Sequence, residues 1–184
     1  MFNIPNLLTM FRLVLVPVFL ACYLMGQTGW AVAAFAVASV TDLFDGMLAR
    51  LLHQQTKLGA LLDPAADKAL GFAALLALVL KGRLPAWFLG LTIFRDAIVI
   101  LLALRARQAG VTAMASPSKV GKYATFFTNL VVVVALAREI SYAPALDGYL
   151  AAVIIAAGQC VLVATVQYLV RFPGMMRLVP KPTA

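Results

Sequence analysis

Four aspartates stand close together in a chain that has few acidic residues. Asp42 and Asp45 are three residues apart, and Asp63 and Asp67 are four residues apart. Residues at these spacings lie on one face of an α-helix, so each pair presents two carboxylates on the same side. The whole chain of 184 residues has only seven acidic side chains. This concentration of carboxylates indicates a cation site.

Converging carboxylates repel each other unless protons or cations neutralise them. Hard divalent cations such as Mg²⁺ prefer carboxylate oxygens and commonly bridge substrate phosphates. Two metals that share carboxylates can act as a clamp for phosphorus chemistry. The alternative is a set of solvated helix ends or structural ion pairs, but the bases near the aspartates in the sequence are only Arg50, Lys57 and Lys68. Ionisable residues in apolar segments are costly, which favours a functional site.

The residues between the two aspartate pairs suit a phosphate ligand. Gly46 lies four residues after Asp42, and Arg50 lies four residues after Gly46, so the three form one stripe on a helix. Glycine lets a ligand approach the backbone, and arginine can hold a phosphate through two hydrogen bonds. Ala49 and Gly59 add further small surfaces.

The segments that must position these residues are strongly apolar. The chain is 64% hydrophobic and 12% charged, whereas a soluble domain is about 45–50% apolar. Apolar runs near the length of about 20 residues that crosses a bilayer recur along it. We expect an all-α integral membrane bundle of six transmembrane helices, forming a single domain over residues 1–184. The spans are expected at about residues 7–25, 30–51, 59–80, 85–104, 119–137 and 146–170.

The basic residues predict the orientation of these spans. If the N-terminus is cytoplasmic, nine basic residues lie at inner ends and loops, and only Lys81, Arg83 and Arg138 lie at outer loops. This positive-inside bias places both termini and the aspartates on the cytoplasmic side, most simply of a bacterial inner membrane. The net charge of +8 then reflects topology and anionic lipid headgroups rather than nucleic acid. Glu139, beside an outer loop, is expected to be solvated.

The aspartates belong to a longer pattern that resembles a known family. From Asp42 to Asp67 the sequence reads D-x2-D-G-x2-A-R-x8-G-x3-D-x3-D. These eight identities at fixed spacing resemble in full the signature of the CDP-alcohol phosphotransferases. The six expected spans and the string "NIPNLLTMFR" near the start extend the resemblance over most of the chain.

The resemblance implies a six-helix membrane enzyme, usually a homodimer, with a cytoplasm-facing site for CDP-diacylglycerol. It implies that two divalent ions, Mg²⁺ or Mn²⁺, are held by Asp42, Asp45, Asp63 and Asp67. It also implies that Asp67 is the general base for an acceptor hydroxyl that attacks the phosphorus carrying the lipid, so that CMP leaves. By the same resemblance the CDP-lipid lies against Gly46, Ala49, Arg50 and Gly59, with Asn6 and Thr41 as further candidates.

A separate group of charged residues is expected to bind the second substrate. Arg95 and Asp96 are adjacent in the middle of the fourth span, and we expect them to point to different faces. Lys119 and Lys122 open the fifth span and suggest an anion pocket. Contact of these lysines with lipid headgroups is an equally open alternative.

Two branches of the family resemble this chain and differ in acceptor. Phosphatidylglycerophosphate synthases usually have Arg-Glu in the fourth span, a later arginine, and a second lysine in the fifth span, where this chain has Asp96, Ala103 and Ala124. Those missing cations would suit the doubly charged glycerol 3-phosphate. The CDP-diacylglycerol type of cardiolipin synthase is closer, so we expect phosphatidylglycerol as acceptor and keep glycerol 3-phosphate as the alternative.

Two other classes of membrane protein could use clustered carboxylates. A cation transporter would place acidic residues across several spans near the midplane, whereas here they fall on one helix pair beside Arg50. An aspartate-rich membrane prenyltransferase would have different aspartate spacing and more spans. Both classes fit the sequence less well than a phosphatidyltransferase.

Overall fold

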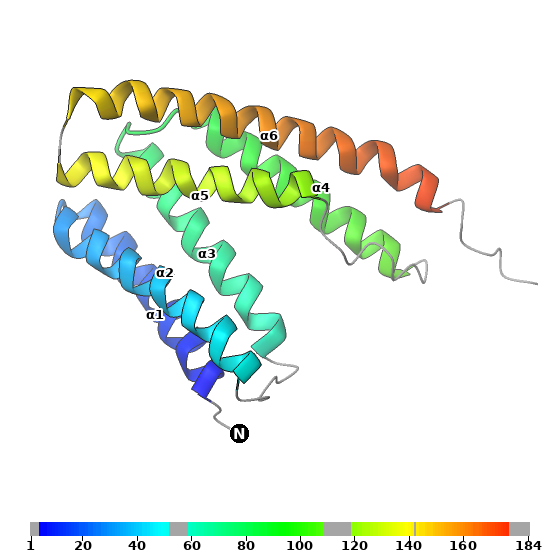
Figure 1. Ribbon diagram of the computed structural model, residues 1–184, viewed down its shortest axis with the longest axis horizontal. Helices are drawn as coiled ribbons and strands as arrows, with labels where there is room; N and C mark the ends of the chain where they lie inside the picture. Colours follow the sequence, from blue (N-terminus) through cyan, green and yellow to red (C-terminus); the bar gives the residue numbers. More distant parts are fainter. Residues whose placement is uncertain (1–3, 52–58, 109–118, 142, 177–184) are drawn as a thin grey trace, which may run out of the picture. The chain divides into compact units, whose positions relative to one another are not determined.

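A computed structural model shows an all-α protein, which confirms the expected class (Figure 1). It describes the backbone of residues 4–51, 59–108, 119–141 and 143–176, and the side chains of residues 8–42, 65–106, 108, 119–141 and 143–171. The described helices are α1 (Ile4–Leu24), α2 (Thr28–Leu51), α3 (Gly59–Leu80), α4 (Ala86–Gln108), α5 (Lys119–Ile140) and α6 (Pro144–Met176).

Glycine and proline set several of the helix boundaries. Gly26 follows α1 and Gly82 follows α3, with backbone φ angles of 82° and 68°. Glycine adopts this left-handed conformation without a steric penalty, so it commonly ends a helix. Pro144 begins α6, and Pro85 directly precedes α4. Proline is favoured at the start of a helix because its missing N–H would have no intrahelical partner there.

Within the described residues, three helical segments are long and apolar enough to cross a membrane. They are Ala86–Ala106, Lys119–Ile140 and Pro144–Arg171, and Leu8–Leu24 is a shorter apolar helix. Large apolar side chains such as Phe94, Phe126 and Val166 lie exposed on these helices. Exposed apolar surface of this kind is stable in lipid rather than water, so the helices indicate a multi-pass membrane protein.

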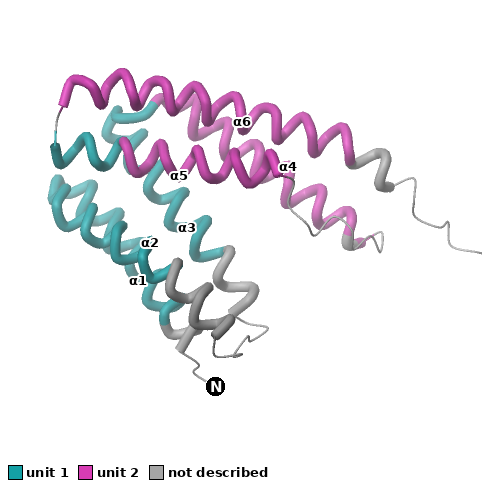
Figure 2. Tube along the Cα trace, viewed as in Figure 1, with its two compact units in different colours: residues 1–84, 135–142 teal, residues 85–134, 143–184 magenta. Residues whose placement is uncertain are grey.

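The chain divides into two compact units (Figure 2). Unit 1 consists of residues Met1–Leu84 and Ala135–Tyr142, and it contains α1, α2, α3 and the end of α5. Unit 2 consists of Pro85–Val134 and Ala143–Ala184, and it contains α4, most of α5 and α6.

In unit 1, α1 packs closely against both α2 and α3, whereas α2 and α3 meet each other at few positions. Phe19 of α1 stacks on Tyr23 with ring centroids 5.9 Å apart and meets Phe35 of α2 at 5.8 Å. Fully buried small residues, such as Ala38 of α2 and Ala77 of α3, allow close approach of the helices. In the described part of the unit, α1 is thus the helix that packs closely against both of the others.

Polar contacts stabilise the end of unit 1 that lies away from the start of α1. Arg83 Nε lies 2.9 Å from Glu139 Oε1, and Lys81 Nζ donates to the carbonyl of Leu24 at 2.9 Å. The expectation that Glu139 is solvated is wrong, because its side chain is only 13% exposed and pairs with Arg83. The end of α5 packs into this unit, which brings the carboxylate to the arginine.

In unit 2, α4 packs against α6, and residues of α5 complete the core. The apolar core cluster consists of Ala124, Val161 and Ala164, with Leu91, Val120 and Cys160 packed against it. Trp87 of α4 lies over Gly158 of α6, where an added Cβ would be 3.3 Å from the indole ring. A side chain at this position would therefore press against the indole ring.

Candidate functional site

The four aspartates lie on two helices of unit 1. Asp42 and Asp45 are in the second half of α2, and Asp63 and Asp67 are in the first half of α3. Because consecutive helices run in opposite directions, the start of α1, the end of α2 and the start of α3 share one end of the unit (Figure 1). The side chains of Asp42 and Asp67 are described, whereas those of Asp45 and Asp63 lie outside the described side chains.

An arginine from α1 contacts the first of these aspartates. Arg12 Nη1 lies 2.7 Å from Asp42 Oδ1, so the two side chains form a close ion pair. The Arg12 side chain is 0% exposed, whereas the Asp42 side chain is 41% exposed. The arginine of this ion pair is therefore inaccessible from outside the protein, whereas part of the aspartate remains accessible.

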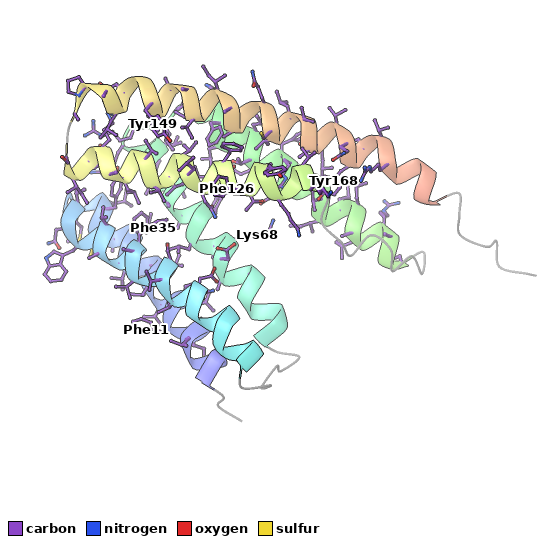
Figure 3. All side chains as sticks on the ribbon, in the orientation of Figure 1. Phe11, Phe35, Lys68, Phe126, Tyr149 and Tyr168 are labelled. Atoms are coloured by element: carbon purple, nitrogen blue, oxygen red, sulfur yellow. The ribbon has the colours of Figure 1, made fainter. Side chains whose placement is uncertain are left out.

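Asp67 completes a three-helix cluster with this pair. Asp42, Arg12 and Lys68 all lie near enough to act electrostatically on the Asp67 carboxylate. Asp67 is half-buried, and the exposed Lys68 follows it on α3, where Figure 3 labels it. The packing of α1 against both α2 and α3 explains how one arginine pairs with Asp42 and also acts electrostatically on Asp67.

The chemistry of this cluster suits a hard divalent cation. Asp42 and Asp67 supply carboxylate oxygens from two helices, and the exposed part of Asp42 is open to a ligand. Within the described side chains there is no group of three or more acidic, histidine or cysteine residues. Asp45 and Asp63, which would complete such a group, are outside that part of the chain, so their role stays a prediction.

The residues expected around the CDP-lipid lie on the same helices as the aspartates. Thr41 precedes Asp42, and its hydroxyl donates to helix carbonyls of Val37 and Ala38 at 3.0 and 2.8 Å. Its oxygen can still accept a hydrogen bond. The remaining candidates have side chains outside the described part: Asn6 on α1, Gly46, Ala49 and Arg50 on α2, and Gly59 on α3.

The residues expected to bind the acceptor lie in unit 2. The Arg95 side chain is 13% exposed, and its Nη1 lies 2.8 Å from Asp96 Oδ1. The expectation that these neighbours point to different faces is wrong, because the long arginine side chain folds back to its neighbour. Arg95 Nη2 also donates to the carbonyl of Gly121 at 2.9 Å. Gly121 lies between Lys119 and Lys122, which are both exposed.

Arg12 is the described residue of this site that the sequence analysis missed. Bases were considered only where they lie near the aspartates in the sequence, and Arg12 precedes Asp42 by thirty residues. A usable signal was present, because Arg12 interrupts an apolar run, and an ionisable residue within a membrane helix indicates a functional role by default.

The chain is similar to proteins of known family. Residues 2–167 match the family described as CDP-alcohol phosphatidyltransferase. A "Probable phosphatidylglycerophosphate synthase" of Mycobacterium tuberculosis is 42% identical over 117 residues, which cover 59% of this chain and 55% of that protein. A "Putative cardiolipin synthase" of Mycobacterium bovis is 38% identical over 125 residues, covering 67% of this chain and 59% of that protein.

A bacterial relative with a defined acceptor in its name is also similar. The "CDP-diacylglycerol--glycerol-3-phosphate 3-phosphatidyltransferase" of Escherichia coli is 38% identical over 131 residues, covering 67% of this chain and 71% of that protein. The chain spans little more than half the length of the two mycobacterial relatives. The names of these relatives divide between two acceptors, glycerol 3-phosphate and the acceptor of a cardiolipin synthase.

Proposed function

Because the chain belongs to the CDP-alcohol phosphatidyltransferase family, we propose that it transfers a phosphatidyl group from CDP-diacylglycerol to a glycerol-type alcohol and releases CMP. The observation that carries the proposal is the ion pair of Arg12 with Asp42 at one end of unit 1, near enough to Asp67 of a third helix to act on it electrostatically. Charged groups so clustered in an apolar helical protein are costly unless they serve a ligand.

The aspartates are proposed to serve both the metal and the proton transfer. Asp42, Asp45, Asp63 and Asp67 would hold Mg²⁺ or Mn²⁺, two per site, which when bound neutralise the pyrophosphate and stabilise the leaving phosphate. Asp67 takes the proton of the acceptor hydroxyl. The hydroxyl oxygen forms a bond to the phosphorus that carries the lipid, and the bond from that phosphorus to the CMP oxygen breaks.

The CDP-lipid is proposed to lie along α2, next to the aspartates. Arg50 binds a phosphate through its planar guanidinium, and Gly46 lets the diphosphate approach the helix. Thr41 offers a hydroxyl oxygen at the same end of α2. The full set proposed to contact the CDP-lipid is Asn6, Thr41, Gly46, Ala49, Arg50 and Gly59.

We propose phosphatidylglycerol as the acceptor, bound by Lys119, Lys122 and Arg95. Ala124 stands where a phosphatidylglycerophosphate synthase usually has a second lysine, and it is fully buried in the core of unit 2. Residue 124 therefore packs in the apolar core and adds no positive charge to the acceptor site. The guanidinium of Arg95 is already bonded to Asp96 and Gly121. A site with so few available cations suits a phosphodiester, which has one negative charge. Glycerol 3-phosphate remains the alternative acceptor, and the names of two relatives support it.

The proposed enzyme is a single domain with six membrane spans in a bacterial inner membrane. Both termini and the aspartates face the cytoplasm, which follows from the bias of basic residues. A homodimer is proposed from the family resemblance alone.

A CMP-release assay tests this function. Purified protein is supplied with labelled CDP-diacylglycerol, Mg²⁺ or Mn²⁺, and either phosphatidylglycerol, glycerol 3-phosphate or no acceptor. CMP release that requires both metal and phosphatidylglycerol is expected. Release with glycerol 3-phosphate alone would make the proposed acceptor wrong, and no metal-dependent release with any acceptor would make the reaction wrong.

A further inference from the structure

Arg12 is a fully buried cation beside a partly exposed carboxylate. It is among the largest side chains of the described core that have no exposed surface. Burial of a charge costs several kcal/mol and is tolerated when a partner of good geometry offsets it. The ion pair between Nη1 and Asp42 Oδ1, at 2.7 Å, supplies a partner of opposite charge.

The burial of Arg12 excludes direct binding of a substrate phosphate in this conformation. An arginine that binds phosphate must present N–H groups to the ligand, and Arg12 has no exposed surface. Asp42, by contrast, is 41% exposed and remains open to a ligand. Arg12 therefore acts on a bound ligand indirectly, through the carboxylates near it.

Arg12 also lies near the second described carboxylate of the cluster. Asp42 and Asp67 act on each other as like charges, and Arg12 acts on Asp67 with the opposite sign. A guanidinium is always charged and has a planar set of donors, so it can both orient a carboxylate and reduce the repulsion between two of them. A residue that only filled space in the core would need neither the permanent charge nor the planar set of donors.

We propose that Arg12 is a positioning residue that holds the Asp42 carboxylate in one orientation for the divalent cation. It offsets the repulsion between Asp42 and Asp67 at the same time. The proposal rests on the proposed metal-dependent function, but it concerns the affinity of the protein for the cation before any substrate binds.

The affinity of the full-length protein for Mn²⁺ alone tests the proposal. Free Mn²⁺ is measured by electron paramagnetic resonance, without CDP-lipid or acceptor. Removal of groups that orient metal ligands typically weakens metal binding about 10–100-fold, so the Kd of Arg12→Met is expected to rise at least about tenfold. Arg12→Lys keeps the charge but loses the planar fork, so its Kd is expected to lie between those of the wild type and Arg12→Met.

Arg83→Met is the matched control. It also removes an arginine from an arginine–carboxylate pair of unit 1, with Arg83 Nε 2.9 Å from Glu139 Oε1. Arg83 is sixteen residues from Asp67 along the chain, and most of that stretch is helix rising about 1.5 Å per residue. Its Mn²⁺ affinity is expected to stay within about twofold of the wild type, because Arg83 follows the far end of α3 from Asp67.

Each outcome decides the proposal. Folded Arg12→Met that binds Mn²⁺ as tightly as the wild type, or more tightly, would overturn it. If neither Arg12 variant yields a folded protein, Arg12 is a structural residue and the proposal is equally wrong. A wild type that binds no Mn²⁺ would refute the proposed function and this inference together. A wild type that binds Mn²⁺ but releases no CMP would refute the proposed function alone.

Discussion

The bond that Arg95 makes from α4 to α5 predicts a measurable loss of stability in Arg95→Met. The guanidinium donates through Nη2 to the carbonyl of Gly121 at 2.9 Å and pairs through Nη1 with Asp96 at 2.8 Å. Methionine retains much of the apolar length of the side chain and removes these interactions, together with the longer hydrogen bond from Nη1 to the Thr125 hydroxyl at 3.4 Å. The change therefore isolates the polar bridge within unit 2.

The expected loss of stability is small, because the Gly121 carbonyl and the Asp96 carboxylate both keep other polar interactions. The carbonyl of Gly121 also accepts from the Thr125 hydroxyl at 3.1 Å. Asp96 keeps a further interaction besides its pair with Arg95. Hydrogen bonds between membrane helices contribute about 0.6 kcal/mol on average and up to about 1.7 kcal/mol, and half-exposed ion pairs about 0–1 kcal/mol. We therefore expect the free energy of unfolding to fall by roughly 1–2 kcal/mol.

Thermal unfolding of the purified protein in detergent measures this loss. For a chain of this size, 1 kcal/mol corresponds to about 2–4 °C in Tm. Thr128→Val is the control, because it removes a hydrogen bond of a hydroxyl on the same helix, from Thr128 to the Ala124 carbonyl one turn earlier. A Tm of Arg95→Met equal to that of Thr128→Val would refute the bridge. If stability falls but the KM for the acceptor does not change, Arg95 has no place in the proposed acceptor site.

Three further outcomes are expected. Asp67→Asn abolishes CMP release but keeps equilibrium binding of CDP-lipid, since it removes the base and little volume, and turnover near the wild-type rate would contradict that role. Removal of divalent cations with a chelator abolishes CMP release, and added Mg²⁺ or Mn²⁺ restores it, so activity that survives chelation would contradict the metal site. Gly158→Leu lowers the free energy of unfolding by about 1–3 kcal/mol, because the side chain meets the Trp87 ring where a Cβ alone would lie 3.3 Å away. Gly158→Ala is its control, since alanine favours a helix over glycine by about 1 kcal/mol, and equal Tm values for the two variants would contradict the predicted clash.

The helices could be predicted from the sequence because their signals are local. Apolar run length, glycine and proline placed all six within a few residues, and the third was expected at its observed bounds of Gly59–Leu80. The aspartates were found for the same reason, since residues three or four apart share a helix face whatever the helix packs against.

Side-chain partners could not be predicted, because they depend on how helices far apart in the sequence pack. Glu139 is paired because the end of α5 belongs to unit 1 beside Arg83. Arg95 reaches the carbonyl of Gly121 because α5 lies beside α4 at this position. Neither arrangement follows from the spacing of residues along one helix.

The position of α1 changes how the aspartate pattern is interpreted. The pattern lies on α2 and α3 alone, which suggests a site built by two facing helices, but these helices meet at few positions. The helix that contacts both is α1, and it supplies Arg12 to the carboxylates. A shift of α1 would therefore move Asp42 relative to Asp67 through the bond that Arg12 makes. It follows that substitutions on the buried face of α1, such as those at Phe19, should alter cation affinity in proportion to how far they displace Arg12, although no residue of α1 belongs to the aspartate pattern.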